Sequence, residues 1–330
     1  MPAKTIVAQV LRTLLKHIEP TQGATTHFGP SLANQPNMPT VLPRQLWEQV
    51  TAIASLNQAW AKVRANGGAA GTDGETLEGF ARRLDTNLRR LQRDLETGAY
   101  RPEPVRRVMV PKPQGGQRPL SILAVRDRVA QRSVYDALAP FYETRFLDCS
   151  YAFRENRSTQ DAVNAIAAWR ERGLFWVADG DISQCFERID HDVLMQQLND
   201  DIKDRRVLRL IRLWLRARVL NEMASARPMG APQGGVISPL LSNVYLHAFD
   251  VALTEQNLAL VRYADDWVVL CKSEADAQAA LQTASDALTR LKLAINPHKT
   301  RVTHFEQGFS FVGAFFVKNQ QYWISAGHSK

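Results

Sequence analysis

The chain has 330 residues, of which 45% are hydrophobic, 8% aromatic and 22% charged, and its formal net charge is +8 at pH 7. This composition is ordinary for a folded protein and excludes collagen-like, low-complexity and wholly disordered chains, while the basic excess favours a polyanionic partner without proving one. Three widely spaced cysteines, Cys149, Cys185 and Cys271, indicate neither a disulfide framework nor a zinc ribbon, and they predict a reducing cytoplasm as the location.

Residues 1–45 are predicted to form an amphipathic helix followed by a flexible linker. Apolar residues repeat at helical spacing from Thr5 to Ile18, with polar and basic residues between them. This stretch is shorter than the roughly 20 apolar residues of a membrane-spanning helix, and it lacks the core of a signal peptide. Glycines and prolines among polar residues then predict a linker over 20–45. We therefore expect no membrane segment and a folded body that begins near Leu46.

Helices dominate the predicted first half of the body. A strand over Val105–Val110 is followed by a turn at Pro111–Pro119 and a second strand. Helical periodicity, together with helix-breaking residues that mark helix ends, predicts four helices, over Leu46–Val63, Thr76–Glu96, Asp127–Leu147 and Thr159–Arg172.

The predicted second half mixes strands and helices. A short apolar strand over Trp176–Ile182 carries an aspartate near its end, Leu260–Lys272 reads as a hairpin with aspartates at its tip, and the tail from Phe309 is strand-like. Further helices are predicted over His191–Leu198, with Asp190 as cap, and over Arg205–Val219, Pro239–Ala252 and Ala275–Leu291. The order has no βαβ rhythm and therefore favours an α+β fold.

Three aspartates in apolar surroundings are the best candidates for chemistry. Asp181 follows an apolar strand, while Asp265 and Asp266 interrupt the apolar run of the hairpin. Adjacent acids are costly if buried and unpaired, and Mg²⁺, which takes oxygen ligands and binds substrate phosphates, would compensate their charge. Two such ions about 4 Å apart can activate a 3′-hydroxyl and stabilise a leaving pyrophosphate. The alternatives are a plain polar turn for the pair and a strand end or cap for Asp181.

Several sequence blocks resemble, in order, the motifs of reverse transcriptases, most closely those encoded by group II introns and their CRISPR-associated bacterial relatives. Tyr263-Ala-Asp-Asp resembles the catalytic box, Asp181-Ile-Ser-Gln-Cys-Phe the first metal-binding box, and Pro232-Gln-Gly-Gly-Val-Ile-Ser-Pro the nucleotide-pocket motif. Upstream blocks of the group II type begin at Asn66, Arg106, Arg118 and Phe153. Each block alone is weak, but their shared order over Leu56–Phe316 is highly specific.

The resemblance implies a right-hand polymerase with fingers and palm, in which an antiparallel palm sheet is backed by helices. We expect residues 46–172 to form mainly the fingers and 173–330 mainly the palm with the catalytic motifs. Because the chain stops at Lys330, we expect no thumb within it. The chain would then be a truncated polymerase core, a compact stand-alone enzyme, or a subunit for which a protein partner or fused domain supplies that function.

The resemblance also implies a two-metal site. Asp181, Asp265 and Asp266 would hold two Mg²⁺ ions, with Mn²⁺ as a substitute and the Ile182 carbonyl as a further ligand. Phe186 matches the steric gate that would clash with a ribose 2′-hydroxyl and so select dNTPs. Without the motif, a simple core phenylalanine is an equal interpretation of Phe186.

Further residues match positions that would contact the nucleotide. Lys112 and Arg118 would clamp the triphosphate, although a solvated basic loop is the alternative. Gln233 and Gly234 would let the backbone approach the nucleotide and the template base. Lys299, in Asn296-Pro-His-Lys-Thr, matches a lysine that would protonate pyrophosphate.

Five arginines are candidates for binding the phosphate backbone of a heteroduplex. Arg209, Arg212 and Arg216 are spaced to share one helix face, and Arg154 and Arg157 belong to the block that begins at Phe153. Such contacts would weaken with salt through counterion release. A solvated charged face is the alternative for the Arg209 helix.

The sequence therefore predicts an RNA-directed DNA polymerase that adds dNTPs to a DNA or RNA primer on an RNA template. Its setting would be group II-like, CRISPR-associated or phage defence. The alternatives are an RNA-dependent RNA polymerase, which Phe186 disfavours, and a non-catalytic nucleic-acid-binding subunit with a polymerase fold, which the intact aspartates disfavour. A partner-dependent subunit is a third alternative, and it predicts weak, non-processive activity alone.

Overall fold

The computed structural model describes residues 42, 45–111, 116–217, 219 and 229–324. These residues divide into two compact units: unit 1 takes in the chain up to Thr144 together with His191–Leu241, and unit 2 takes in Arg145–Asp190 together with the chain from Ser242. Neither unit coincides with the ranges 46–172 and 173–330, and the assignment of those ranges to fingers and palm stays a prediction. The helix predicted over Thr5–Ile18 lies outside the described residues.

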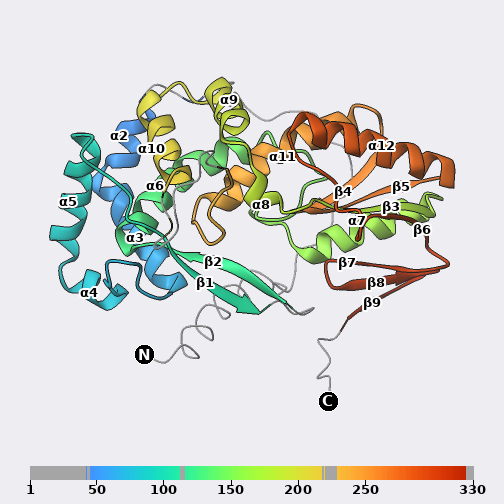
Figure 1. The fold of residues 1–330 in the computed structure, drawn as a ribbon, viewed down its shortest axis with the longest axis horizontal. Coiled ribbons are helices and arrows are strands. Elements are labelled where there is room, and N and C mark those ends of the chain that lie inside the picture. The colour runs from blue at the N-terminus through green and yellow to red at the C-terminus, as the bar shows by residue number, and fades with distance from the viewer. Residues whose placement is uncertain (1–41, 43–44, 112–115, 218, 220–228, 325–330) are drawn as a thin grey trace, which may run out of the picture. The chain divides into compact units, whose positions relative to one another are not determined.

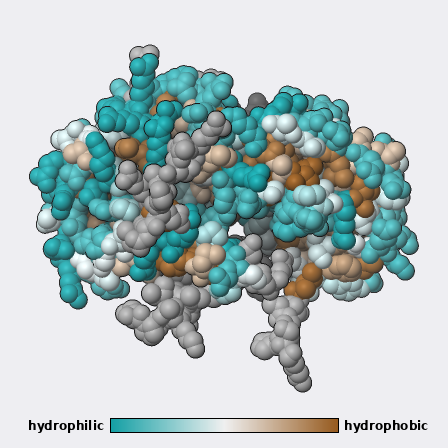
Figure 2. Space-filling model, in the orientation of Figure 1, coloured by the Kyte–Doolittle hydropathy of each residue, from teal (hydrophilic) through white to brown (hydrophobic). Residues whose placement is uncertain are grey.

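Unit 1 is mainly helical (Figure 1). Helix α3 packs against α5 and α6, and α2 packs against α6. The inner face of α5 buries three leucines, Leu88, Leu91 and Leu95, whereas its outer surface is hydrophilic (Figure 2). The helices are α2 (Leu46–Thr51), α3 (Ile53–Asn66), α4 (Leu77–Arg82), α5 (Leu84–Glu96), α6 (Val125–Glu143), α9 (His191–Asp201) and α10 (Arg205–Leu215).

One long helix predicted over Leu46–Val63 is two helices in the structure. They are separated at Ala52, which has φ −56° and ψ 135°. The break leaves the Val50 carbonyl accessible to the Ser133 hydroxyl, which donates a 2.7 Å hydrogen bond to it. Ser133 lies on α6, so the break is supported by a contact far away in sequence that local periodicity does not reveal. The prediction of an uninterrupted helix was therefore wrong.

The predicted helix over Thr76–Glu96 is also divided, at Arg83, where φ is −125°. Thr76 caps the first part by accepting a hydrogen bond from the Gly79 N–H at 3.0 Å. The predicted strand pair of unit 1 is confirmed as the antiparallel hairpin of β1 (Arg106–Pro111) and β2 (Gln117–Ile122).

The main sheet of unit 2 is antiparallel, with strand order β4-β5-β3-β6. The hairpin expected over Leu260–Lys272 is present as β4 (Ala259–Tyr263) and β5 (Asp266–Cys271). Strand β3 (Trp176–Asp181) lies between β5 and the edge strand β6 (Arg301–His304). The sequence patterns did not predict β6, a four-residue edge strand with one buried side chain.

Helices cover both faces of this sheet (Figure 1). On one face, residues of α7 such as Val163 and Ile166 pack with Val177 and Val268. On the other face, α12 packs against β3, β5 and β6, and Trp267 contacts the Phe249 ring with centroids 5.6 Å apart. The helices of this unit are α7 (Thr159–Glu171), α8 (Cys185–Arg188), most of α11 (Ser238–Thr254) and α12 (Glu274–Arg290).

A second, smaller antiparallel sheet follows in unit 2. It consists of β7 (Phe309–Phe311), β8 (Ala314–Val317) and β9 (Gln320–Trp323). The Phe309 and Phe316 rings stack with centroids 5.0 Å apart and belong to the same hydrophobic core as α7. Aromatic packing thus attaches the small sheet to the rest of the unit.

In the described part of the chain, no helix combines the length and the apolar character needed to cross a membrane. The three cysteines are all free thiols.

Candidate active site

The three candidate aspartates meet where two central strands of unit 2 end. Asp181 is the last residue of β3 and pairs in register with Asp266, the first residue of β5. Asp265 lies in the two-residue turn between β4 and β5, and its carbonyl accepts a 3.2 Å hydrogen bond from the Ile182 N–H. The antiparallel register of the sheet therefore brings together acids that are more than eighty positions apart in sequence.

The turn that presents Asp265 has an unusual backbone. Ala264 has φ 58°, in the left-handed region that favours glycine or asparagine. Non-glycine residues in this region cost about 1–3 kcal/mol and are retained where the surrounding structure holds them. The turn is consequently fixed by its surroundings and not by the local preference of alanine.

Asp181 is held from one side by the loop before β6. Its carboxylate accepts hydrogen bonds from Asn296 Nδ2 at 2.9 Å and from Lys299 Nζ at 2.7 Å. The Asp181 side chain is 10% exposed, whereas that of Lys299 is 59% exposed. The Asn296 N–H also donates to the Asp181 carbonyl at 2.8 Å. The sequence motif that contains both residues singled out Lys299 and gave Asn296 no role of its own.

Negative charge is concentrated at the strand ends. Burial raises the pKa of Asp265, and the Asp181 charge raises it further. Removal of water by the surrounding chain, together with the charges of Asp265 and Asp181, raises the pKa of Asp266 to about 7. The hydrogen bond to Asp181 raises the pKa of Lys299. Ionising Asp265 and Asp266 is therefore costly, and a bound cation would relieve that cost.

The donor set fits a hard divalent cation. Among the described residues, no three acidic, histidine or cysteine side chains form a ready-made metal cluster. Mg²⁺ commonly binds through one or two carboxylates and substrate phosphates, without a cage made entirely by the protein. Asp181, Asp265 and Asp266 supply such carboxylates, and the Ile182 carbonyl stays a predicted further ligand. Mn²⁺ suits the same oxygen ligands.

Phe186, the candidate sugar gate, lies on α8, just after the strand that carries Asp181. Its ring contacts the Phe153 ring edge to face, with centroids 6.4 Å apart and an interplanar angle of 81°. Phe153 is 44% exposed and has φ 60°, so a large apolar side chain is held at the surface in a strained conformation. The sequence block that begins at Phe153 resembles the family, but from sequence alone this residue received no role.

The other predicted nucleotide contacts belong to unit 1. Arg118 lies on β2, and the Gln233 carbonyl accepts a 2.6 Å hydrogen bond from the Ser121 N–H of the same strand. Gly234 has φ 102°, and a Cβ at this position would lie 2.5 Å from the Ser121 carbonyl oxygen. Glycine is therefore required for this turn to approach β2. Lys112 lies outside the described residues, and nucleotide binding by this group stays a prediction.

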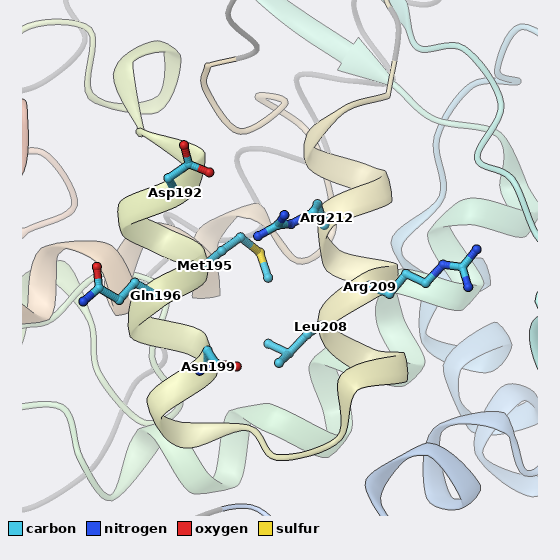
Figure 3. Close-up of a pocket in the computed structure, with 7 residues that line it drawn as sticks. All are labelled: Asp192, Met195, Gln196, Asn199, Leu208, Arg209 and Arg212. Carbon is cyan, nitrogen blue, oxygen red and sulfur yellow. The ribbon is translucent and has the colours of Figure 1, made fainter.

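The three arginines of the α10 region are exposed. Arg209 and Arg212 border a groove of about 500 Å³ between α9 and α10. Figure 3 shows Arg212 directed toward Met195 of α9, whereas Arg209 extends away from α9. Arg216 follows at the end of the helix. Their binding of nucleic acid stays a prediction.

Arg154 and Arg157 differ in their surroundings. Arg154 is 8% exposed, and its Nη1 donates to the carbonyls of Leu147 and Ser150 at 2.6 and 2.9 Å. Arg157 is more accessible and pairs with Asp148 at 2.5 Å. The structure thus favours Arg157 over Arg154 as a contact for nucleic acid, and both assignments stay predictions.

Comparison with known proteins identifies the family. The family model described as reverse transcriptase (RNA-dependent DNA polymerase) matches residues 110–316. The chain belongs to the reverse transcriptase family. Protein YkfC of Escherichia coli (strain K12) is 33% identical over 291 residues, which cover 76% of each protein. The predicted family and enzyme class, RNA-directed DNA polymerase, are thereby confirmed.

The group II kinship is supported as well. Group II intron-encoded protein LtrA of Lactococcus lactis subsp. cremoris is 36% identical over 197 residues, which cover 58% of this chain. The matched region spans 32% of LtrA, about a third of its length. This reverse transcriptase therefore shares with LtrA a segment and not a whole protein.

A solved structure agrees with the predicted fold. Telomerase from Candida albicans, in complex with a fragment of telomeric RNA, matches with a TM-score of 0.55 at 12% identity. The match covers 77% of this chain and 51% of the telomerase chain. The α+β polymerase fold with an antiparallel sheet backed by helices is thus confirmed.

Proposed function

We propose that this reverse transcriptase adds dNTPs to a primer 3′ end on an RNA template by two-metal phosphoryl transfer at Asp181, Asp265 and Asp266. The observation that carries the proposal is that these three residues lie together where β3 ends and β5 begins, with raised pKa values for Asp265 and Asp266. Carboxylates are ligands that Mg²⁺ takes together with substrate phosphates, so these residues would suit that ion.

Each residue of the cluster has a distinct role. Asp181 and Asp265 would hold the two ions, Asp266 would be a supporting acid, and the Ile182 carbonyl would be a further ligand. Bound Mg²⁺ supplies activation of the primer hydroxyl and neutralisation of charge on the phosphates. Asn296 keeps the Asp181 carboxylate in place through its 2.9 Å hydrogen bond.

Lys299 is proposed to give a proton to the leaving pyrophosphate. Its ammonium donates a 2.7 Å hydrogen bond to the carboxylate of Asp181, so a proton donor lies beside a predicted metal-binding residue. The long and exposed side chain can change partner at little cost because most of it already contacts water.

Selection of dNTPs is assigned to Phe186. A ring beneath the sugar excludes a ribose 2′-hydroxyl. The edge-to-face contact with Phe153 limits the movement of that ring and so supports a fixed gate. This arrangement favours DNA synthesis over RNA synthesis.

The setting is proposed from the relatives and the composition. Similarity to a group II intron-encoded protein favours a group II-like role, with CRISPR-associated or phage-defence roles as further settings. Three free cysteines and a basic chain suit a cytoplasmic protein that binds RNA template and primer.

Primer extension tests the proposal directly. Wild type, Asp265→Ala/Asp266→Ala and the control Asp286→Ala, which removes an exposed acid of α12, are each incubated with Mg²⁺, dNTPs and an RNA template carrying a DNA or RNA primer. We expect DNA from wild type and control and none from the double variant.

The other outcomes would distinguish among the alternative functions. DNA from the double variant would overturn the metal site. Product with rNTPs at the same efficiency would indicate an RNA polymerase. No product from wild type across salt concentrations, primers and Mn²⁺ would favour a partner-dependent or non-catalytic subunit.

A further inference from the structure

Arg262 is a completely buried cation one position before the Tyr263-Ala-Asp-Asp motif. Its side chain and that of Asp250, on α11, are both 0% exposed. Arg262 Nε and Nη2 donate to the two carboxylate oxygens of Asp250, each at 2.6 Å. Burial alone would lower the pKa of Arg262, and the Asp250 charge and hydrogen bonds raise it above its ordinary value. The pair is therefore a fixed ion pair inside unit 2.

The remaining donors of the Arg262 guanidinium are also used. Nη2 donates to Ser150 Oγ at 2.7 Å, and Nη1 donates to Asn243 Oδ1 at 3.2 Å and to the Ala264 carbonyl at 3.0 Å. All five guanidinium N–H groups thus have acceptors, which is what a buried arginine needs to be stable.

The contact with the Ala264 carbonyl reaches the metal-binding turn. Ala264 is the strained residue with φ 58° that immediately precedes Asp265. A carbonyl held by a buried guanidinium cannot rotate freely, so the peptide that leads into Asp265 is fixed in direction. Arg262 therefore supplies the tertiary support that the local sequence of the turn lacks.

The contact with Asn243 links Arg262 to a second segment of the chain, the one that contains Ala152. Asn243 Nδ2 donates to the Ala152 carbonyl at 2.8 Å, while its Oδ1 accepts from Arg262. Ala152 immediately precedes Phe153, whose ring contacts Phe186. One buried asparagine therefore connects the support of the metal-binding turn to the segment that carries the exposed phenylalanine.

We propose that Arg262, Asp250 and Asn243 are positioning residues that set the metal-binding turn and the Phe153 side of the sugar pocket together. The inference rests on the proposed function for the pocket and goes beyond it by coupling metal affinity to sugar selection. Neither Arg262 nor Asn243 touches the substrate in this proposal; both act through Ala264 and Ala152.

Asn243→Ala is the informative variant. It removes both asparagine links and leaves the Arg262–Asp250 pair intact, so it avoids leaving a buried charge alone. Ser133→Ala is the matched control, because Ser133 is a buried polar residue of unit 1 whose hydroxyl donates one 2.7 Å hydrogen bond to a carbonyl. A third variant, Ser150→Ala, removes one acceptor of the guanidinium but keeps the link to Ala152.

Two readouts separate positioning from stability. Mn²⁺ binding is titrated by electron paramagnetic resonance on the whole chain without nucleic acid, and the ratio of dNTP to rNTP incorporation is measured by primer extension. For Asn243→Ala we expect about tenfold weaker Mn²⁺ binding and about tenfold poorer sugar selection. Ser150→Ala should weaken Mn²⁺ binding alone, and Ser133→Ala should change neither.

Different results would contradict the positioning inference and the proposed function. If Asn243→Ala lowers the unfolding temperature but changes neither Mn²⁺ binding nor sugar selection, the network is only structural and the inference is overturned. If wild type makes no DNA while Mn²⁺ binding still depends on Asn243, the proposed function fails and positioning of the turn stands.

Discussion

The β4–β5 hairpin of unit 2 contains two groups of charged residues in contrasting environments. At Arg262, in β4, a buried guanidinium has an acceptor for each N–H, and its counterion is equally buried. At the tip, Asp265 and Asp266 face a third acid, Asp181. Within the described residues, the ion pair seen at these three carboxylates is the one that Asp181 makes with Lys299.

The difference distinguishes a structural ion pair from a cluster of acids that is a candidate for chemistry. A fully paired buried charge contributes a single fixed geometry, because any movement would leave a donor or acceptor without a partner. At the tip, burial and the neighbouring like charges make ionisation costly, and that cost appears as the raised pKa values of Asp265 and Asp266. A rigid base therefore supports a tip whose acids are the proposed metal ligands.

The largest expected effect is on catalysis, from Asp265→Asn. This change keeps the side-chain shape but removes a metal-binding charge, so DNA synthesis should fall by at least about a thousandfold. The thermal unfolding midpoint should stay the same or rise, because repulsion at the tip is reduced. Primer extension and thermal unfolding of the same preparation provide the check, and a large loss of stability would contradict the contrast between tip and base.

The next effect is on stability, from Arg262→Met. Leaving the Asp250 charge buried and unpaired should lower the free energy of unfolding by about 3–5 kcal/mol. The double variant Arg262→Met/Asp250→Leu should recover much of this loss, because no buried charge remains. Urea unfolding of the three proteins, wild type included, measures the effect. A single variant as stable as wild type would show that the pair does not anchor the hairpin.

Gly180→Ala tests apolar packing between the same strands. Gly180 pairs with Trp267, and a Cβ there would lie 2.2 Å from the buried indole ring. We expect a loss of about 1–3 kcal/mol in urea unfolding, because Trp267 must shift next to Asp266. Gly79→Ala, in α4, is the control, since its Cβ would lie 3.4 Å from the nearest atom. Equal losses in both variants would refute the steric explanation.

The smallest effect concerns pH. The pKa of Asp266 is about 7 in the folded chain against an ordinary value of 3.8, so the folded state binds the proton more tightly. Its contribution to stability is therefore complete below about pH 4 and is lost as the pH rises to about 7. Because Asp266 is exposed, water limits the change to about 1 kcal/mol.

Comparing wild type with Asp266→Asn isolates this contribution. Urea unfolding between pH 4 and pH 8 with a chelator should show a decline in wild type that is smaller in the variant, and added Mg²⁺ should oppose the decline in wild type. Identical pH profiles for both proteins would show that the acids at the tip do not repel one another as described.

Much of the site could be predicted from local sequence. Asp265 and Asp266 interrupt an apolar run, and Asp181 ends another, so their motifs identify both strands and the chemistry. The hairpin and the α+β fold followed from apolar patterns and the order of elements, whereas the antiparallel sheet backed by helices followed from the resemblance to reverse transcriptases. The division at Ala52 could not be predicted, because the Ser133 hydroxyl that supports it comes from another helix.

The sequence by itself determined the family, the acids and much of the order of strands and helices, because apolar periodicity and short motifs depend on neighbouring residues. Only the tertiary structure decided that Arg262, Asp250 and Asn243 are buried together and that Asn296 holds Asp181. These polar residues lie far apart in sequence and look like surface residues by type. Their burial depends on partners that only the folded chain supplies.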